Sequence, residues 1–141
     1  VEQLASGSAA MPFSLGLHPY FQVSSLENAV LEGLPQTCIN HHTMAAAPTS
    51  EQLRRLPEGI DLLAGPTAAV RLLDQGSGTA VALLPEAPFD LAVVWTDPPR
   101  PMVCLEPWTA PRGALLDGDR CLYLQPGHKK LLKCNFTFAK L

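Results

Sequence analysis

The stretch Met102–Thr109, MVCLEPWT, predicts a buried strand that ends by turning a carboxylate toward a loop. Its first four residues are apolar, which is typical of a strand covered on both faces or of the inner run of a sandwich. Glu106 follows them, although a Glu is almost never fully buried without a partner. Pro107 forces Glu106 into an extended conformation and removes the next backbone donor, so we expect regular pairing to stop there. Trp108 can then form one wall of a cavity.

Two residues that precede prolines are candidates for acid–base chemistry. Glu106, at a strand end beside an aromatic ring, is a candidate general base, and the alternative is a Glu that ends the strand and caps a loop. His18 precedes Pro19 and is therefore also expected in extended backbone where pairing breaks. It is a candidate acid or base because only His titrates near neutral pH unperturbed. The alternative is a His that is hydrogen-bonded at a strand end.

Composition indicates a single domain over residues 1–141. The chain is 47% hydrophobic and 16% charged, enough for one core and small for two. With a net charge of −3 and no basic cluster beyond the lysines near residue 130, we expect no nucleic-acid partner. No apolar run reaches the roughly 20 residues that span a bilayer, and no signal peptide is recognisable. We therefore expect a cytoplasmic protein without a membrane partner, whose four cysteines are buried free thiols; two disulfides are the alternative.

Short apolar runs separated by turn residues predict an all-β fold, an antiparallel β-sandwich. Fourteen prolines and ten glycines leave little room for helices, and only Met44–Leu56 is predicted as one short helix. Residues 69–74 and 79–84 are expected to form a hairpin, and Phe89–Trp95 is too apolar for an edge strand. Residues 29–32 and 37–40 are predicted as two short strands joined by a turn, and two further strands, 121–124 and 131–138, are expected to close the chain around a turn.

Three further features bear on a site. His41 and His42 are adjacent, so in a strand their rings would point to opposite faces and could not share one ion; we expect no metal. Asp61 lies between apolar neighbours, and the alternative to a functional role is a loop carboxylate that accepts backbone N–H bonds. Trp95 and Trp108 are expected at the two ends of one connection unit, where they line one cavity or simply pack in the core.

Four segments together resemble the aldose 1-epimerase (galactose mutarotase-like) family. They are Leu17–Phe21 (LHPYF), Glu58–Asp61 (EGID), Val93–Trp95 (VVW) and Val103–Thr109 (VCLEPWT), in this order. The likeness is nearest to the hexose-6-phosphate epimerase and uncharacterised bacterial branches of that family. It extends over essentially the whole chain but only over the later portion of a family domain, so we expect a missing N-terminal portion of the same domain. The resemblance implies an antiparallel β-supersandwich, in agreement with the all-β prediction.

The resemblance also implies an activity, the interconversion of α and β sugar anomers. In such enzymes the His of the HPYF-type motif is the general acid and the late Glu is the general base, which assigns these roles to His18 and Glu106. Asp61 matches an acidic residue that hydrogen-bonds sugar hydroxyls, and an aromatic ring such as Trp95 or Trp108 offers an apolar surface to the sugar. Acid–base groups suffice for this chemistry, so no cofactor is expected.

One departure from the family leaves two functions open. Family members also use an Arg and often another His from the earlier part of their domain, and only seventeen residues precede His18. The ligand is expected to be a small-molecule sugar or a sugar phosphate, and Arg71, Arg100 and Arg112 are available for a phosphate without a basis for choosing among them. The alternative to an epimerase is a carbohydrate-binding β-sandwich module without catalytic activity.

Overall fold

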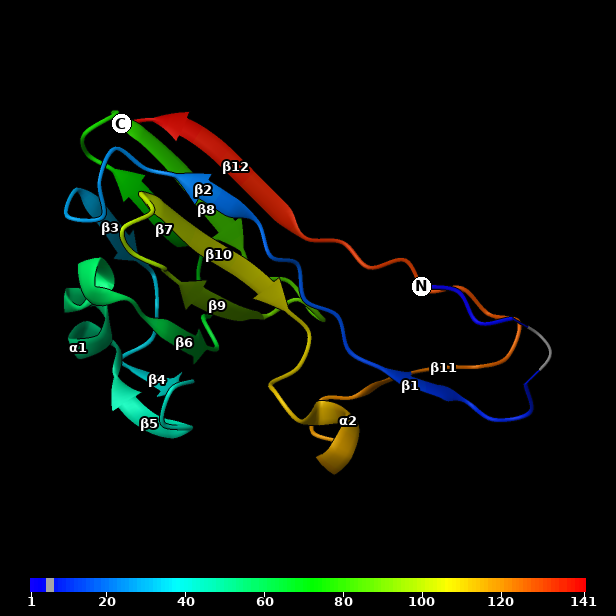
Figure 1. Cartoon of the computed structure of the whole chain (residues 1–141). Coiled ribbons are helices and arrows are strands. Elements are labelled where there is room, and N and C mark those ends of the chain that lie inside the picture. The colour runs from blue at the N-terminus through cyan, green and yellow to red at the C-terminus, as the bar shows by residue number, and fades with distance from the viewer. Residues whose placement is uncertain (5–6) are drawn as a thin grey trace.

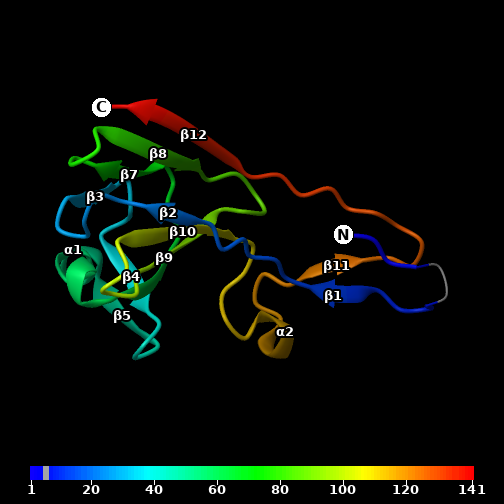
Figure 2. The same cartoon turned by 45° about the horizontal axis from the view of Figure 1, so that its top comes forward.

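The computed structural model describes residues 1–4 and 7–141 and shows two antiparallel sheets packed face to face (Figures 1 and 2). The larger sheet has the spatial order β2 (Tyr20–Gln22), β10 (Met102–Trp108), β9 (Leu91–Trp95), β6 (Asp61–Ala64), β4 (Thr37–Asn40) and β5 (Ala45–Pro48). The smaller sheet has the order β12 (Asn135–Lys140), β8 (Thr79–Leu84), β7 (Val70–Asp74) and β3 (Ala29–Glu32). The prediction of an all-β sandwich is thereby confirmed.

The core lies between the two sheets. The smaller sheet contributes Leu72 and Leu83, and the larger sheet contributes Leu62, Val94 and Leu105, all at most 2% exposed. Successive strand residues point to opposite faces, so every second residue of β6, β9 and β10 enters this core. The intervening residues of these strands therefore lie on the outer face of the larger sheet.

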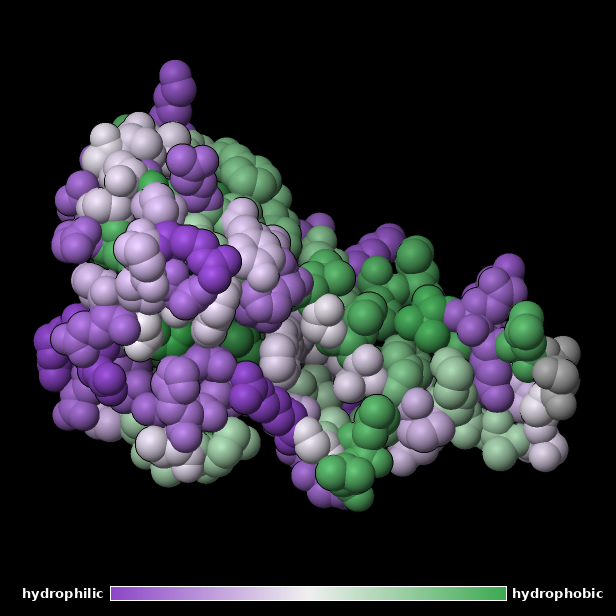
Figure 3. All heavy atoms as spheres, viewed as in Figure 1, coloured by the Kyte–Doolittle hydropathy of each residue, from purple (hydrophilic) through white to green (hydrophobic). Residues whose placement is uncertain are grey.

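A two-stranded ribbon extends from one end of the sandwich (Figures 1 and 2). It pairs β1 (Met11–Phe13) with β11 (Leu122–Leu124), and the short helix α2 (Ala114–Asp117) lies beside it. Apolar side chains are exposed on this extension, as the green surface in Figure 3 shows. They include Leu4, Leu115, Leu116 and Leu131, which are 60 to 94% exposed.

The strand prediction was right about most elements and wrong about several pairings. The hairpin of β7 and β8 and the central position of β9 are confirmed. The strands β3 and β4 exist as predicted but lie in different sheets, because the chain crosses the sandwich between them. The last two predicted strands do not pair with each other, since β11 pairs with β1 and β12 with β8. Phe136 of β12 packs on the core, with its ring 5.6 Å from that of Phe21.

The helix is shorter than predicted. Residues 45–48 form β5, which pairs with β4, and α1 covers only Thr49–Arg54 before the 3-10 turn η1 (Leu56–Glu58). Pairing with a sheet edge has overridden the helix propensity of the three alanines in β5. Pro48 occupies the N-cap position, and no side chain caps the start of the helix. The helix α2 is a second short helix, whereas only one helix was predicted. In the described part of the chain, no helix is long and apolar enough to cross a membrane.

Regular pairing does not stop at Pro107, contrary to the expectation. Strand β10 continues to Trp108, and Pro107 lies opposite Ala92 of β9. The Pro107 carbonyl accepts the Leu17 N–H at 3.1 Å on the other side of the strand. Since the N–H and C=O of one residue point to the same side of an antiparallel strand, the missing donor of Pro107 faces the irregular segment before β2. The ladder with β9 therefore loses nothing at this position.

The four cysteines are free thiols, as expected. Cys38 and Cys104 are buried, whereas Cys121 and Cys134 are partly exposed and so depart from the expectation of four buried thiols.

Candidate active site

The site lies on the outer face of the larger sheet, on the side chains that alternate with the core. In β10, Val103 and Leu105 enter the core, while Cys104, Glu106 and Trp108 point the other way. Burial of this strand is therefore two-sided, as its run of apolar residues predicted. The alternation along β10 that buries Val103 and Leu105 in the core therefore places the Glu106 carboxylate on the opposite face.

Strand register then brings the predicted residues together. Trp95 of β9 lies opposite both Asp61 of β6 and Cys104 of β10, so these three residues form one row across the sheet. Glu106 lies in the next row, opposite Val93. Positions far apart in the chain thus become neighbours on one face.

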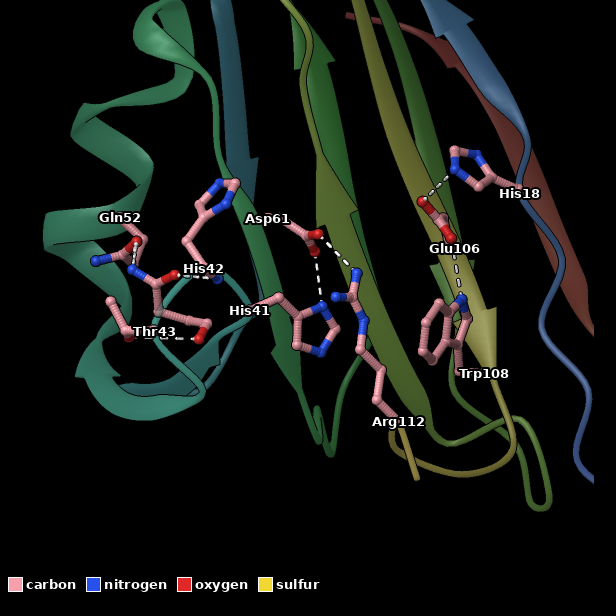
Figure 4. Close-up of polar contacts among 10 residues, drawn as sticks. His18, His41, His42, Thr43, Gln52, Asp61, Glu106, Trp108 and Arg112 are labelled. Atoms are coloured by element: carbon pink, nitrogen blue, oxygen red, sulfur yellow. Dashed lines mark hydrogen bonds and ion pairs between the residues drawn. The ribbon is translucent and has the colours of Figure 1, made fainter. Parts of the chain in front are cut away.

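His18 and Glu106 are in direct contact (Figure 4). The imidazole Nε2 lies 3.3 Å from Oε1 of the carboxylate, and the two side chains are 49% and 2% exposed. The imidazole stacks on Tyr20 with ring centroids 4.8 Å apart and meets the edge of Trp95 at 5.5 Å. One partner is therefore accessible to a ligand while the other is buried behind it.

Trp108 fixes the other oxygen of Glu106. Its indole Nε1–H donates a hydrogen bond of 3.0 Å to Oε2, so Oε1 is left facing His18 (Figure 4). Gly16 packs against this indole, and a Cβ at that position would lie 2.8 Å from the indole Cδ1 and Nε1 atoms. A side chain at residue 16 would therefore displace the ring that orients the carboxylate.

Burial raises the pKa of the Glu106 carboxyl above its ordinary value. The hydrogen bond from Trp108 and the charges of His18 and Arg112 act against this rise, whereas the charge of Asp61 adds to it. Desolvation disfavours the ionised form of a carboxyl group. The result is a carboxylate with a stronger affinity for protons than an exposed Glu, which suits a general base.

A second cluster joins Asp61, His41 and Arg112 (Figure 4). The Asp61 Oδ1 atom lies 2.7 Å from Nδ1 of His41, and Oδ2 accepts a hydrogen bond of 2.8 Å from Nη2 of Arg112. The His41 side chain is 1% exposed, and burial lowers its pKa although Asp61 opposes the shift. Its Nε2 has no hydrogen-bond partner among the residues that the structure describes. His41 lies against Trp108, with ring centroids 5.9 Å apart.

Two adjoining hollows open onto these side chains. The larger is a cavity of about 390 Å³ between the segment 14–18 and the loop that leads into α2. The smaller, of about 170 Å³, is lined by Asp61, Val93 and Trp95. His18, Glu106, Trp108 and Arg112 line both. A cavity of a few hundred Å³ with a few convergent polar groups is the usual form of a small-molecule site.

The structure thus brings together all five residues proposed from the sequence. The smaller hollow is lined by His18, Glu106, Asp61, Trp95 and Trp108. The two tryptophans therefore line one cavity, which was one of the two interpretations of this pair. Asp61 begins a strand and is not a loop carboxylate.

Sequence reasoning missed two residues of this site. Arg112 was one of three unassigned arginines, and His41 was considered only together with His42. The two histidines lie in a turn after β4, where His41 is buried and His42 is exposed, with their rings apart (Figure 4). The structure thus places an Arg and a second His beside Asp61. That an earlier segment supplies the Arg and His of the family stays a prediction.

Comparison with known proteins gives the class of fold. No family model matches the chain, and no curated protein sequence matches it. A solved structure from Synechocystis sp. PCC 6803 is similar with a TM-score of 0.81 at 23% identity, over 96% of this chain and 47% of that one. A galactose mutarotase-like protein from Clostridium acetobutylicum gives 0.69 at 15% identity, over 95% and 49%. An aldose 1-epimerase candidate from Escherichia coli K12 gives 0.69 at 17% identity, over 96% and 53%.

These likenesses show that the chain shares the all-β fold of the three structures, one of which is described as galactose mutarotase-like. The motifs of its sequence implied such a fold, and the chain spans about half the length of each of the three structures. At such identities the likeness establishes the fold, and any activity has to follow from the chemistry of the site.

Proposed function

We propose that this chain carries the acid–base pair of an aldose 1-epimerase, which interconverts the α and β anomers of an aldose or a hexose 6-phosphate. The observation that carries the proposal is the 3.3 Å contact between His18 Nε2 and Glu106 Oε1 at the wall common to two hollows. An imidazole and a carboxylate so placed can give and take a proton on one small ligand.

The chemistry needs one proton removed and one proton supplied. Glu106 takes the proton of the anomeric hydroxyl while His18 protonates the ring oxygen, and the bond between C1 and the ring oxygen breaks to give the free aldehyde. Rotation about C1–C2 and closure from the other face reverse both transfers. The hydroxyl and the ring oxygen are both bonded to C1, so an acid and a base that touch each other can reach them together. A sugar would then replace the direct contact between the two side chains.

The surroundings of the pair support these roles. Glu106 is buried and oriented by Trp108, so its accepting oxygen is fixed before a ligand arrives. His is the side chain that exchanges protons most readily near neutral pH, and His18 is half-exposed toward the ligand. No cofactor enters the proposed reaction.

The remaining residues would bind and orient the sugar. Asp61 keeps free lone pairs on a carboxylate that His41 and Arg112 hold, and these can accept sugar hydroxyls. Trp95 and Trp108 present ring surfaces for the C–H face of a pyranose. Whether a preceding segment adds further contacts stays a prediction, because the chain spans about half the length of its structural neighbours.

The test is the rate at which freshly dissolved α-glucose, α-galactose or α-glucose 6-phosphate reaches anomeric equilibrium, followed by optical rotation. We expect acceleration by the chain and a loss of about 10²–10⁴-fold in Glu106→Gln and in His18→Asn. The exposed residues Glu51 and His128 provide matched controls, since Glu51→Gln and His128→Asn should leave the rate unchanged. Sugar binding without acceleration would contradict the proposal and favour the carbohydrate-binding module.

A further inference from the structure

Cys104 lies within reach of both proposed catalytic groups, and the proposed reaction does not use it. It precedes Glu106 by two positions in β10, so both side chains lie on the same face of the sheet. Ligand atoms of His18, Cys104 and Glu106 all lie within 4.8 Å of one another. The three residues bring together a ring nitrogen, a sulfur and a carboxylate oxygen.

We propose that His18, Cys104 and Glu106 form a Zn²⁺ site that overlaps the acid–base pair. Thiolate, imidazole and carboxylate are the three kinds of ligand that proteins use for Zn²⁺, whereas Mg²⁺ and Ca²⁺ prefer oxygen alone. Three protein ligands leave a fourth, open position that a water molecule from the adjoining hollow can take. Modest side-chain adjustment brings atoms within 4.8 Å of one another onto one tetrahedral ion.

Two neighbouring side chains already orient the proposed ligands. Trp108 donates to Oε2 of Glu106 and leaves Oε1 as the ligand atom on the side of His18. Tyr20 stacks on His18 and so fixes the plane of the imidazole. Such partners orient the ligands of protein metal sites. His18 is half-exposed, so one of the three ligands can be approached directly from solvent.

Metal binding must displace the proton of the thiol. Burial and the charge of Glu106 raise the pKa of Cys104 to about 12, so without metal the group is a thiol at neutral pH. On binding, a Zn–S bond forms, the S–H bond breaks and the proton leaves to solvent, while the neutral imidazole donates its lone pair. One proton should therefore be released for each Cys104 thiol that binds the ion.

A buried cysteine is most often a small apolar core residue, and Cys38 shows the contrast. Cys38 is equally buried, but its Sγ atom lies 3.6 Å from the carbonyl oxygen of Ala47 and it belongs to the core cluster. It is not a member of the cluster of ligand atoms. Cys104, in contrast, shares one side of the sheet with a histidine and a carboxylate.

The ion would block the proposed reaction, because it occupies both the acid and the base. This inhibition rests on the proposed function, whereas the binding of metal does not. Zn²⁺ should therefore inhibit anomer interconversion reversibly, with activity restored by a chelator. A chain that binds the ion but never accelerates interconversion would retain the metal site and lose the proposed function.

The experiment uses Co²⁺ as a spectroscopic probe of the whole chain with reduced thiols. We expect tetrahedral Co²⁺ bands and a near-ultraviolet thiolate-to-cobalt charge-transfer band, both removed when Zn²⁺ displaces the probe. Cys104→Ser should abolish the charge-transfer band and weaken Zn²⁺ binding at least about a hundredfold, more than the loss of a residue that only orients a ligand. Cys121→Ser, at a partly exposed thiol outside the cluster, is the control and should retain both.

Cobalt binding without a thiolate band, or a band that persists in Cys104→Ser, would overturn the proposal. His18→Asn provides a second variant should the serine variant fail to fold, because His18 is half-exposed. It should keep the charge-transfer band and lose at least about tenfold in Zn²⁺ affinity. Unchanged affinity in that variant would also contradict the site.

Discussion

The indole N–H of Trp108 holds one oxygen of the Glu106 carboxylate at 3.0 Å, although Pro107 stands between the two residues. Both side chains lie on the same face of β10 because they are two positions apart. The strand continues through the proline, so the hydrogen bond forms within regular structure and not in a flexible turn. The orientation of the proposed base is therefore built into a single strand.

Removal of this indole donor should change the pH dependence of the proposed activity. The hydrogen bond favours the ionised carboxylate, so Trp108→Phe should raise the pKa of Glu106 further. A protonated Glu106 cannot act as a base, and the acid limb of the pH–rate profile should therefore move to higher pH. Trp95→Phe is the control, because Trp95 lines the same hollow without bonding Glu106. If the acid limb of the pH–rate profile does not move in Trp108→Phe, the indole does not control the pKa of Glu106.

The ionised Glu106 should cost stability at neutral pH. Because burial raises its pKa, the folded state binds this proton more tightly than the unfolded chain does. The stability that the proton contributes is present at low pH and is lost as pH rises through the folded pKa. Glu106→Gln should therefore raise the Tm at pH 7 by a few degrees, as about 1 kcal/mol does in a domain of this size, with a smaller difference near pH 4. A lower Tm at pH 7 would contradict this expectation.

Asp61 should be important for folding as well as for the site. Asp61→Ala leaves the buried Nδ1 of His41 without its partner, which should cost about 1–3 kcal/mol in the free energy of unfolding by urea. Asp97→Ala, which removes an exposed ion pair with Arg100, should cost less than about 1 kcal/mol. Equal losses in the two variants would show that the contact between Asp61 and His41 is not structural.

Asp74 should stabilise the fold in a manner that disappears in acid. Its buried position would raise the pKa, but hydrogen bonds from Ser24 and Ser77 outweigh this and lower it to about 2. A lowered pKa contributes stability that is present above the unfolded value and is lost as pH falls toward 2. Asp74→Asn should therefore lower the Tm at pH 7 by several degrees and have little effect near pH 2 in melting curves followed by circular dichroism. A pH-independent difference would assign the effect to packing.

Much of the fold could be predicted because apolar runs mark strands directly. The buried strand Met102–Thr109 and the central strand that ends at Trp95 follow from composition over a few residues. Pairing between distant strands could not be predicted in the same way. The turn at Gly33, with a φ of 84°, takes the chain from one sheet to the other. The residues around Gly33 do not distinguish such a turn from the turn of a hairpin.

Site residues that belong to a sequence motif could be predicted, whereas residues that only the path of the chain brings to the site could not. His18, Asp61 and Glu106 stood out through the resemblance to a family. His41 lies in the site because its backbone N–H donates to the Asp61 carbonyl at 2.9 Å, where β4 pairs with β6. Two adjacent histidines in a sequence do not indicate this long-range pairing. Arg112 reaches Asp61 from the turn-rich segment after β10, and its direction depends on the path of that loop.

The measurement that tests the central claim most directly is the rate of anomer interconversion in the double variant His18→Asn/Glu106→Gln beside each single variant. Groups that act as one acid–base unit lose most of their effect with the first substitution. We therefore predict a double variant about as slow as the slower single variant, with wild-type-like circular dichroism in all three. Losses that multiply, or single variants as fast as the wild type, would contradict the account of His18 and Glu106 as one catalytic pair.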